Sequence, residues 1–374
     1  MAVLITLLIV CVFFAYAIET VKSEKARTRL TIICLTLMAL VSGTRLLGGT
    51  DFFIYHGHYN HLATFPQILD PAYQSESFEI GYTYIASFFK TLGFSFYGFC
   101  LIHSIFFYFC LWKGLKRYTS HFGIVILVFL YKLFFYNTMI SMRQSITVAC
   151  FLLMVPWIEE KKYIKYYIAT YFVALIHNGA YLLYLIYPLV YVALSKDRIR
   201  VLNLIFFPTL FIGLAGVDVI GPLGEFIKDN AADENLVNKT ATYFENENIS
   251  PIGIFHTVEY FAVMIFVYIN VDKLDLRNSK VHIVMWMFLC MLPLFTLLRG
   301  SEVLTREKDY FLIYYAVIIG YLIDKLPKSR NLIYVLVTLI CAAGYVRYIY
   351  AFDGGAFMKY ESWLFDPHYS MFLK

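Results

Sequence analysis

Apolar runs recur along the whole chain, each roughly 17 to 20 residues long, which is enough for an α-helix to cross about 30 Å of hydrocarbon. Charged residues make up 15% of the 374 residues, well below the roughly 25% typical of soluble domains. No polar stretch is long enough to form a separate soluble domain. The sequence therefore predicts one all-α, polytopic membrane domain over residues 1–374.

About twelve membrane-spanning helices are expected from these runs. The first is a retained helix and not a removed signal peptide, because its start lacks a basic region and a small-residue cleavage site. A shorter apolar segment, 79–93, is expected to be an interfacial or re-entrant piece. The spans are placed near residues 2–19, 30–48, 95–112, 122–138, 141–158, 162–178, 179–195, 201–217, 251–270, 281–298, 309–324 and 331–350.

The basic residues indicate the orientation of these spans. They gather in every second loop, and the positive-inside rule assigns such loops to the cytoplasm. Both chain termini are then external. The loops hold Lys22, Lys25, Arg27 and Arg29; Lys113, Lys116 and Arg117; Lys161, Lys162 and Lys165; Lys196, Arg198 and Arg200; Lys273, Arg277 and Lys280; and Lys325, Lys328 and Arg330.

The intervening loops have the opposite character. Residues 49–79 contain four acids and no Lys or Arg, and residues 218–250 are mainly acidic. Both loops, and the tail 351–374, are predicted to be external. All seven cysteines lie within predicted spans and form no CxxC pair, so they are expected to pack as small apolar residues and to form neither disulfides nor a zinc site.

Several ionisable residues lie outside this pattern of basic loops. Although they are far apart in the sequence, the predicted topology places them at one level, on the outer side. Guanidinium groups at a common level suit an anion, because their paired N–H donors bind phosphate oxygens. The alternative is that arginines at helix ends extend towards the outer headgroups. These residues are Arg45, Asp51, Arg143, His177, Arg299 and Arg306.

Arg143 and His177 stand out within this set. Arg143 is followed by Gln144 and flanked by apolar residues, which favours a functional position over an interfacial one. His177 lies at the turn between two predicted spans, where it could transfer a proton or cap the turn. The sequence contains no P-loop, GxGxxG, HExxH or GxSxG signature. Asp51 has no DxD companion, so no metal site is predicted.

The chain resembles the EpsG family of bacterial membrane proteins, relatives of the Wzy O-antigen and capsule polymerases, in the order and spacing of five short motifs. Each motif is degenerate, and the resemblance comes from the whole set over roughly residues 40 to 325. The motifs are "GGTDFFIYHGHY" after the second span, "EIGYTYIASFFKTLGFSFYGF", "MRQSITVACFLL", "ALIHNGAYLL" and, late in the chain, "TREKDYFLIYY".

The resemblance implies a GT-C-like or O-antigen-polymerase-like membrane glycosyltransferase in the bacterial inner membrane, with its active site facing the exterior. It would join undecaprenyl-pyrophosphate-linked repeat units without a metal or other cofactor, in contact with membrane lipid and a chain-length regulator protein, and without nucleic acid. Arginines would hold the donor pyrophosphate as the sugar leaves. The base that deprotonates the acceptor hydroxyl is expected to be His177, then Asp51, then Glu79. The predicted substrate-binding residues are Arg143, Gln144, Arg299, Arg306, Arg45, Tyr55 and Tyr310.

Two other functions remain open from the sequence. A ligase-type transferase would use the same donor and pass the glycan to another lipid, but the modest length of the 218–250 loop favours a polymerase. A transporter of the lipid-linked unit should have charged residues at mid-depth on several spans. Only Lys132 and Glu259 come near that position.

Overall fold

The computed structural model describes residues 1–46, 48–73, 78–230, 253–300 and 302–365, and these residues form helices and turns without a β-strand. The all-α prediction is therefore confirmed for this part of the chain. The predicted outer loop 218–250 lies outside the described residues from position 231 onward, and the predicted tail does so from position 366. The chain divides into two compact units, Met1–Tyr187 with Pro327–Lys374 (unit 1) and Pro188–Leu326 (unit 2).

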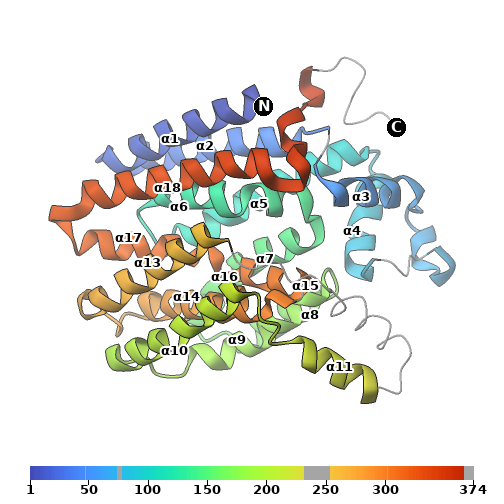
Figure 1. Ribbon diagram of the computed structural model, residues 1–374. Coiled ribbons are helices and arrows are strands. Elements are labelled where there is room, and N and C mark those ends of the chain that lie inside the picture. The colour runs from blue at the N-terminus through green and yellow to red at the C-terminus, as the bar shows by residue number, and fades with distance from the viewer. Residues whose placement is uncertain (47, 74–77, 231–252, 301, 366–374) are drawn as a thin grey trace. The chain divides into compact units, whose positions relative to one another are not determined.

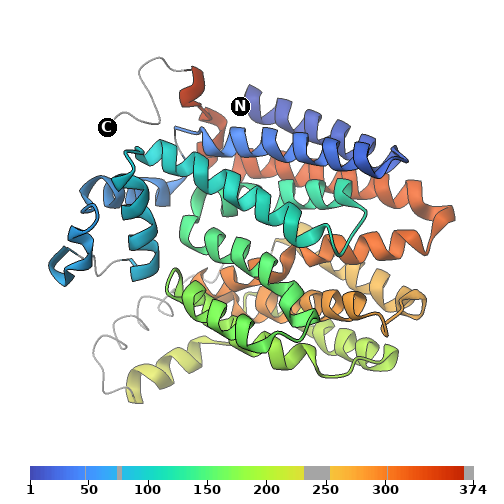
Figure 2. The same ribbon diagram turned by 180° about the vertical axis from the view of Figure 1, so that it is seen from behind.

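Unit 1 is a layered bundle. Its helices α1, α2, α5, α6 and α18 run side by side in both views of the molecule (Figures 1 and 2). The elements of this unit are α1 (Ala2–Thr20), α2 (Glu24–Gly43), α3 (Thr50–His61), η1 (Gln67–Leu69), η2 (Pro71–Tyr73), α4 (Ile80–Thr91), α5 (Phe96–Leu115), α6 (Phe122–Lys132), the π-helical η3 (Tyr136–Ile140), α7 (Met142–Glu159), α8 (Tyr163–Ala174), η4 (Asn178–Leu182), η8 (Pro327–Ser329), α18 (Arg330–Ala351), η9 (Phe352–Lys359) and η10 (Trp363–Phe365).

Unit 2 is also helical, and α9 (Leu183–Val190) straddles the boundary between the units. Within unit 2, the Trp286 indole donates a hydrogen bond to the Val192 carbonyl over 3.0 Å. The Tyr315 hydroxyl donates to Glu259 over 3.0 Å. The elements of this unit are α10 (Lys196–Ala215), α11 (Gly221–Asn230), α13 (Ile254–Asn270), η5 (Val271–Lys273), α14 (Ser279–Thr296), η6 (Leu297–Gly300), α15 (Glu302–Thr305), η7 (Arg306–Lys308), α16 (Asp309–Leu312) and α17 (Tyr314–Asp324).

Serine side chains mark the start of three long helices. The hydroxyls of Ser23, Ser95 and Ser195 each accept a hydrogen bond from a backbone N–H in the first turn of α2, α5 and α10, respectively. Such N-caps satisfy donors that have no partner inside the helix. Each cap fixes where an apolar segment becomes helical.

Seven helices in the described part of the chain are long and apolar enough to cross a membrane, and they support a multi-pass membrane protein. Two further apolar helices are shorter, Phe122–Lys132 and Asn178–Val190. The seven are Ala2–Thr20, Glu24–Gly43, Phe96–Leu115, Lys196–Ala215, Ile254–Lys273, Ser279–Thr296 and Pro327–Ala351.

The expected count of twelve spans is not confirmed by the described residues, in which several predicted spans are interrupted. The span predicted at 162–178 is the 12-residue α8, which at 1.5 Å per residue is about 18 Å long. The span predicted at 122–138 ends at Lys132 and continues as the separate η3. The one predicted at 309–324 is split into α16 and α17. Hydropathy registers the apolar content of such segments but not the breaks within them.

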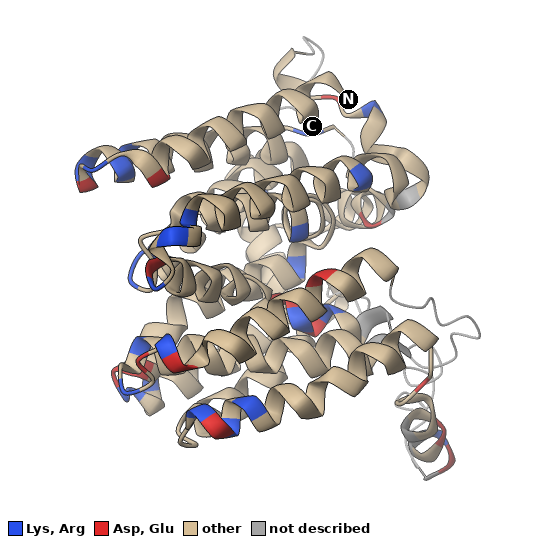
Figure 3. Ribbon diagram, turned by 60° about the vertical axis from the view of Figure 1, so that its left-hand side comes forward, with Lys and Arg blue, Asp and Glu red and all other residues tan. Residues whose placement is uncertain are grey.

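Ion pairs join several turns at one end of unit 1. We call it the lysine-rich end, because the same turns and the helix ends beside them carry Lys113, Lys116, Lys161, Lys162 and Lys165. Arg117, in the turn after α5, pairs with Glu159 at the end of α7 over 2.9 Å. Glu19, at the end of α1, pairs with His121 over 2.6 Å and with Arg330 over 3.8 Å. Figure 3 shows Lys and Arg gathered at the turns between helices. These turns are among those that the charge pattern assigns to one side of a membrane.

Gly114 allows α5 and α7 to approach closely. A Cβ atom at this position would lie 2.6 Å from the carbonyl oxygen of Leu152. Because that oxygen belongs to the backbone of α7, a side chain at position 114 could be accommodated only by moving one helix. The contact sets the packing of the helix that carries Arg143.

We expect Gly114→Ala to destabilise the protein by about 1–3 kcal/mol, the usual cost of overpacking. The matched control is Gly57→Ala in α3, where an added Cβ would meet nothing within 4 Å. This control should be roughly 0.5–1 kcal/mol more stable, since alanine favours a helix over glycine. The measurement is the thermal unfolding midpoint of the purified full-length protein in detergent. Equal midpoints for the two variants would contradict the close contact.

Candidate functional site

A carboxylate, a guanidinium and an imidazole from three distant segments meet in unit 1. Glu79 immediately precedes α4, Arg143 lies in the first turn of α7, and His177 connects α8 to η4. Arg143 Nη1 donates to Glu79 Oε2 in an ion pair. His177 Nδ1 lies 3.2 Å from Glu79 Oε1, and the backbone N–H of Asn178 donates to the same oxygen over 3.2 Å. Three residues predicted to act at the site are thus in direct contact.

Gly81 explains how Glu79 reaches His177. Its backbone N–H donates to the carbonyl of Leu175 over 2.9 Å. A Cβ at position 81 would lie 2.7 Å from that carbonyl oxygen. The start of α4 therefore lies directly against the end of α8. Glu79, two residues before the contact, meets His177, two residues after it.

Aromatic rings surround the guanidinium of Arg143. Its central carbon lies 4.7 Å from the ring centroid of Phe78 and 5.9 Å from that of Tyr55. Arg143 Nε also donates to the Tyr55 hydroxyl over 3.4 Å. The side chain remains partly exposed. The aromatic rings and the Glu79 carboxylate therefore hold the guanidinium of Arg143, and part of the side chain stays accessible.

Glu79 is ionised at neutral pH. Burial alone would raise its pKa, but the hydrogen bond from His177 and the charges of Arg143 and His177 outweigh burial and lower the pKa to about 2. The difference from the ordinary value of 4.5 corresponds to on the order of 3 kcal/mol in favour of the ionised carboxylate. A carboxylate held this way is a strong hydrogen-bond acceptor and a weak base.

His177 has one ring nitrogen committed and one available. Because Glu79 Oε1 is an acceptor, Nδ1 carries the proton in the neutral imidazole, which leaves Nε2 with a lone pair. No described residue forms a hydrogen bond with Nε2, and the side chain is partly exposed. A carboxylate that orients a histidine in this way is a common arrangement for acid–base chemistry.

His58 belongs to the same cluster, although the sequence did not indicate it. Its ring stacks on Phe78 with centroids 4.0 Å apart, and its Nε2 is buried without a hydrogen-bond partner among the described residues. Burial lowers the pKa of His58 to about 4, and the charges of Arg143 and Lys90 act in the same direction. The available signal was its spacing, three residues after Tyr55 on one helix.

Lys90 is the second residue that the sequence did not indicate. Its ammonium donates to the carbonyls of Tyr59, Asn60 and Leu62 over 3.0, 2.7 and 2.8 Å. These carbonyls lie at the end of α3, where helical backbone acceptors lack partners. Lys90 therefore fastens α3 to α4 beside the cluster.

Asp51 and Gln144 lie next to this cluster on its helices. Asp51 is in the first turn of α3, one turn before Tyr55, where a negative charge favours the helix. Gln144 is buried and accepts a hydrogen bond from Ser141 over 3.4 Å. That contact lies at the start of α7, next to Arg143. A substrate contact by either residue stays a prediction.

Arg45 is fully buried, with 0% of its surface exposed. It lies beyond α2, which ends at Gly43 and not at the predicted position 48. Its Nε donates to the Met139 carbonyl over 3.1 Å, and its Nη1 donates to the Ser42 carbonyl over 2.6 Å. These bonds tie the end of α2 to η3. Phosphate binding by Arg45 stays a prediction.

The other predicted site residues lie in unit 2. Arg299 is in η6, and its side chain is outside what the structure describes. Arg306 begins η7, and Tyr310 is fully buried in α16. Burial and the charge of Asp309 raise the pKa of the neighbouring Glu307 to about 8, against the opposing charges of Lys308 and Arg306.

The described residues contain no group of three or more His, Cys, Asp or Glu side chains placed to hold a metal ion. In the same part of the chain, all seven cysteines are free thiols. What the cluster offers chemically is a partly open guanidinium beside a carboxylate-oriented imidazole.

Comparison with known proteins identifies the family. No curated protein and no solved structure matches the chain. The model of the EpsG family matches residues 27–362. The matched region covers most of the chain and includes Glu79, Arg143 and His177. The chain therefore belongs to the EpsG family.

Proposed function

We propose that the protein is a polysaccharide polymerase that joins undecaprenyl-pyrophosphate-linked repeat units at the outer leaflet of the bacterial inner membrane. Membership of the EpsG family suggests a polysaccharide polymerase-like role. The observation that carries the proposal further is the contact of Arg143, Glu79 and His177. This cluster lies at the start of α7, and the lysine-rich end includes the end of the same helix.

Arg143 would bind the pyrophosphate of the lipid-linked donor. Glu79 and Tyr55 fix the orientation of the guanidinium, and the partly exposed side chain can still donate to a phosphate oxygen. Charge-assisted hydrogen bonds of this kind are about twice as strong as neutral ones. They would stabilise the negative charge that develops as the pyrophosphate leaves the anomeric carbon. In this proposal, guanidinium groups stabilise the charge of the leaving pyrophosphate, a role that a metal ion has in other glycosyltransferases.

His177 would take the proton from the attacking sugar hydroxyl. Its Nε2 is the acceptor, and the Glu79 carboxylate would stabilise the imidazolium that forms. Glu79 is then a positioning residue for both Arg143 and His177, since its low pKa makes it a poor proton acceptor at neutral pH. Asp51 remains the second candidate for the base.

Arg299 and Arg306, which lie in unit 2, remain predicted ligands of a phosphate. Glu307 is largely protonated near neutral pH, and Lys308 is paired with Asp309 over 3.3 Å. The segment 306–309 therefore carries a net positive charge, which suits a phosphate. Tyr310 would act as a buried support for this segment.

The aromatic rings beside Arg143 support the guanidinium. Phe78 and Tyr55 are buried, and Phe78 lies between Arg143 and His58, so these rings orient Arg143 and leave its open side to the donor. In the proposed orientation, the lysine-rich end faces the cytoplasm and the cluster of Glu79, Arg143 and His177 faces the exterior. The proposed architecture is GT-C-like. A chain-length regulator protein is the expected partner.

The test of this function uses a strain that lacks the gene and is complemented with variants. Arg143→Ala and Arg143→Lys should both lower the yield of long glycan chains by about a hundred-fold or more, as is typical when one donor to a developing charge is lost. Lysine fails because it cannot reproduce the forked contacts of a guanidinium. Long chains are measured on gels, and lipid-linked intermediates by mass spectrometry.

The control variant is Arg347→Ala, an exposed arginine in α18 that makes no ion pair with the described residues. It should polymerise like the wild type. Full activity of Arg143→Lys would refute phosphate binding by a guanidinium. In the strain without the gene, accumulated single repeats indicate a polymerase, long chains on the carrier lipid a ligase, and repeats left inside the cell a transporter.

The ion pairs of Glu79 predict a specific dependence of stability on pH. The folded-state pKa of about 2 lies below the ordinary 4.5, so the stabilisation is fully present above about pH 4.5 and is lost as the pH falls towards 2. The difference in unfolding midpoint between wild type and Glu79→Gln should shrink over that interval. A difference that stays constant from pH 7 to pH 2.5 would contradict the ionised pair.

A further inference from the structure

A groove of about 630 Å³ lies where α7 ends and α8 begins, all within unit 1. It is distinct from the cluster around Arg143, which lies fourteen residues before Trp157 on α7, or about 21 Å along the helix axis. Residues that line the groove include Trp157, Lys161, Lys162, Lys165, Ile168 and Phe172.

One wall of the groove is apolar and exposed. Ile164, Ile168 and Phe172 recur every four residues on α8 and therefore share one face of the helix. Their exposed fractions are 60%, 54% and 60%. Large apolar side chains exposed in a row are unfavourable in water, at roughly 25 cal/mol for each Å². The wall is suited to contact with a hydrocarbon chain.

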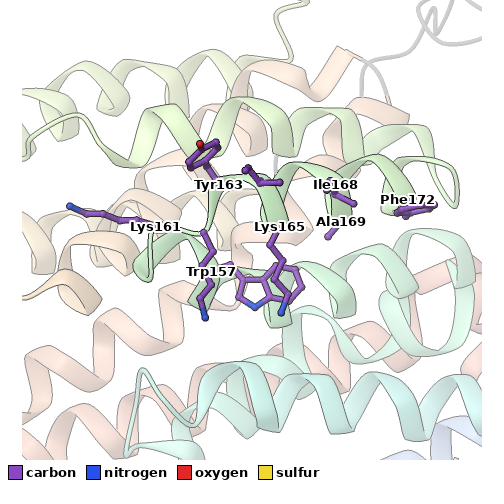
Figure 4. A pocket seen from close by; sticks show the side chains of 9 residues that line it. Trp157, Lys161, Tyr163, Lys165, Ile168, Ala169 and Phe172 are labelled. Atoms are coloured by element: carbon purple, nitrogen blue, oxygen red, sulfur yellow. The ribbon is translucent and has the colours of Figure 1, made fainter.

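The mouth of the groove is basic. Lys165 Nζ lies 4.3 Å from the ring centroid of Trp157, and Figure 4 shows the two side chains next to each other, with Ile168, Ala169 and Phe172 further along the helix. Lys161 and Lys165 make no ion pair with the described residues, and Lys162 pairs with Glu160 over 2.7 Å. Of the three lysines, Lys162 alone is ion-paired with a described residue, and its partner Glu160 also pairs with Arg117 over 2.6 Å.

We propose that this groove binds one anionic phospholipid from the leaflet at the lysine-rich end. The acyl chain would lie along Ile168 and Phe172, and the phosphate would be bound by Lys162 and Lys165. Trp157 would lie at the level of the glycerol, where indole rings favour the boundary between headgroups and hydrocarbon. The order of the side chains, basic, then aromatic, then aliphatic, matches the order of chemical groups along a phospholipid. An anionic headgroup complements the excess of positive charge.

The proposal is tested by native mass spectrometry of the full-length protein in detergent, with palmitoyl-oleoyl phosphatidylglycerol or phosphatidylcholine added. Phosphatidylglycerol should bind more tightly than phosphatidylcholine. Each lysine near an anionic lipid contributes roughly a five-fold factor in affinity. Lys162→Gln/Lys165→Gln should therefore weaken phosphatidylglycerol binding by about ten-fold or more.

The matched control is Lys113→Gln/Lys116→Gln at the end of α5. It removes the same charge from the lysine-rich end, and Lys116 also lies over a tryptophan, with Nζ 4.1 Å from the Trp112 ring centroid. This region does not line the groove, so binding should stay at the wild-type value. An equal loss in both double variants would overturn the proposal and indicate general attraction to surface charge.

Ala169→Trp tests the apolar wall without changing the charge. Ala169 lines the groove, and a bulky side chain there would occupy the space for the acyl chain. Phosphatidylglycerol binding should fall while the unfolding midpoint stays close to that of the wild type. Wild-type binding in a folded Ala169→Trp variant would overturn the proposal, as would displacement of the lipid by glycerol phosphate at the same concentration. Polymerisation is not part of these readouts, so the outcome is independent of the proposed function.

Discussion

The candidate site depends on the Glu79 carboxylate, which accepts hydrogen bonds from three groups on two other segments. Without it, the Arg143 guanidinium and the His177 imidazole would have no common acceptor to orient them. With it, both point towards one acceptor, and their remaining donors and lone pairs are directed elsewhere. Removing one partner of such a pair usually costs more than the pair contributes, because the other charge is left without compensation. We therefore regard Glu79 as the organising residue of the site.

The surroundings of this carboxylate are as important as its partners. Phe78 lies between Arg143 and the ring of His58, and Tyr55 both stacks near the guanidinium and accepts its hydrogen bond. These rings exclude water from one side of the charges, which strengthens the remaining electrostatic interactions. Burial beside these rings also lowers the pKa of His58 in α3, and the charges of Arg143 and Lys90 act in the same direction. The aromatic content of the 49–79 segment therefore has a structural reason.

The sequence predicted the membrane class, most helices and the three central side chains, because hydropathy, loop charge and isolated polar residues are local signals. It predicted that Arg143, His177 and Glu79 act at one site, but it could not show that Glu79 joins the other two. That contact depends on the close approach of Gly81 to Leu175, which has no signal in a single sequence. Arg45 illustrates the converse: it has the same pattern as Arg143, yet the chain turns after Gly43 and buries it. His58 was not predicted because its role depends on the fold of α3 against α4.

The length of α7 determines how deep Arg143 lies in the membrane. This helix has 18 residues and is therefore about 27 Å long, slightly shorter than a typical hydrocarbon core of about 30 Å. If Trp157 is anchored at one interface, Arg143, about 21 Å away along the helix axis, lies roughly 9 Å below the opposite edge of the hydrocarbon core. The bilayer must then thin locally, or water must enter around the start of α7. For the lipid-linked donor of the proposed function, such thinning would bring the charged group towards the depth of the guanidinium, so that the shape of the membrane around α7 would become part of substrate access.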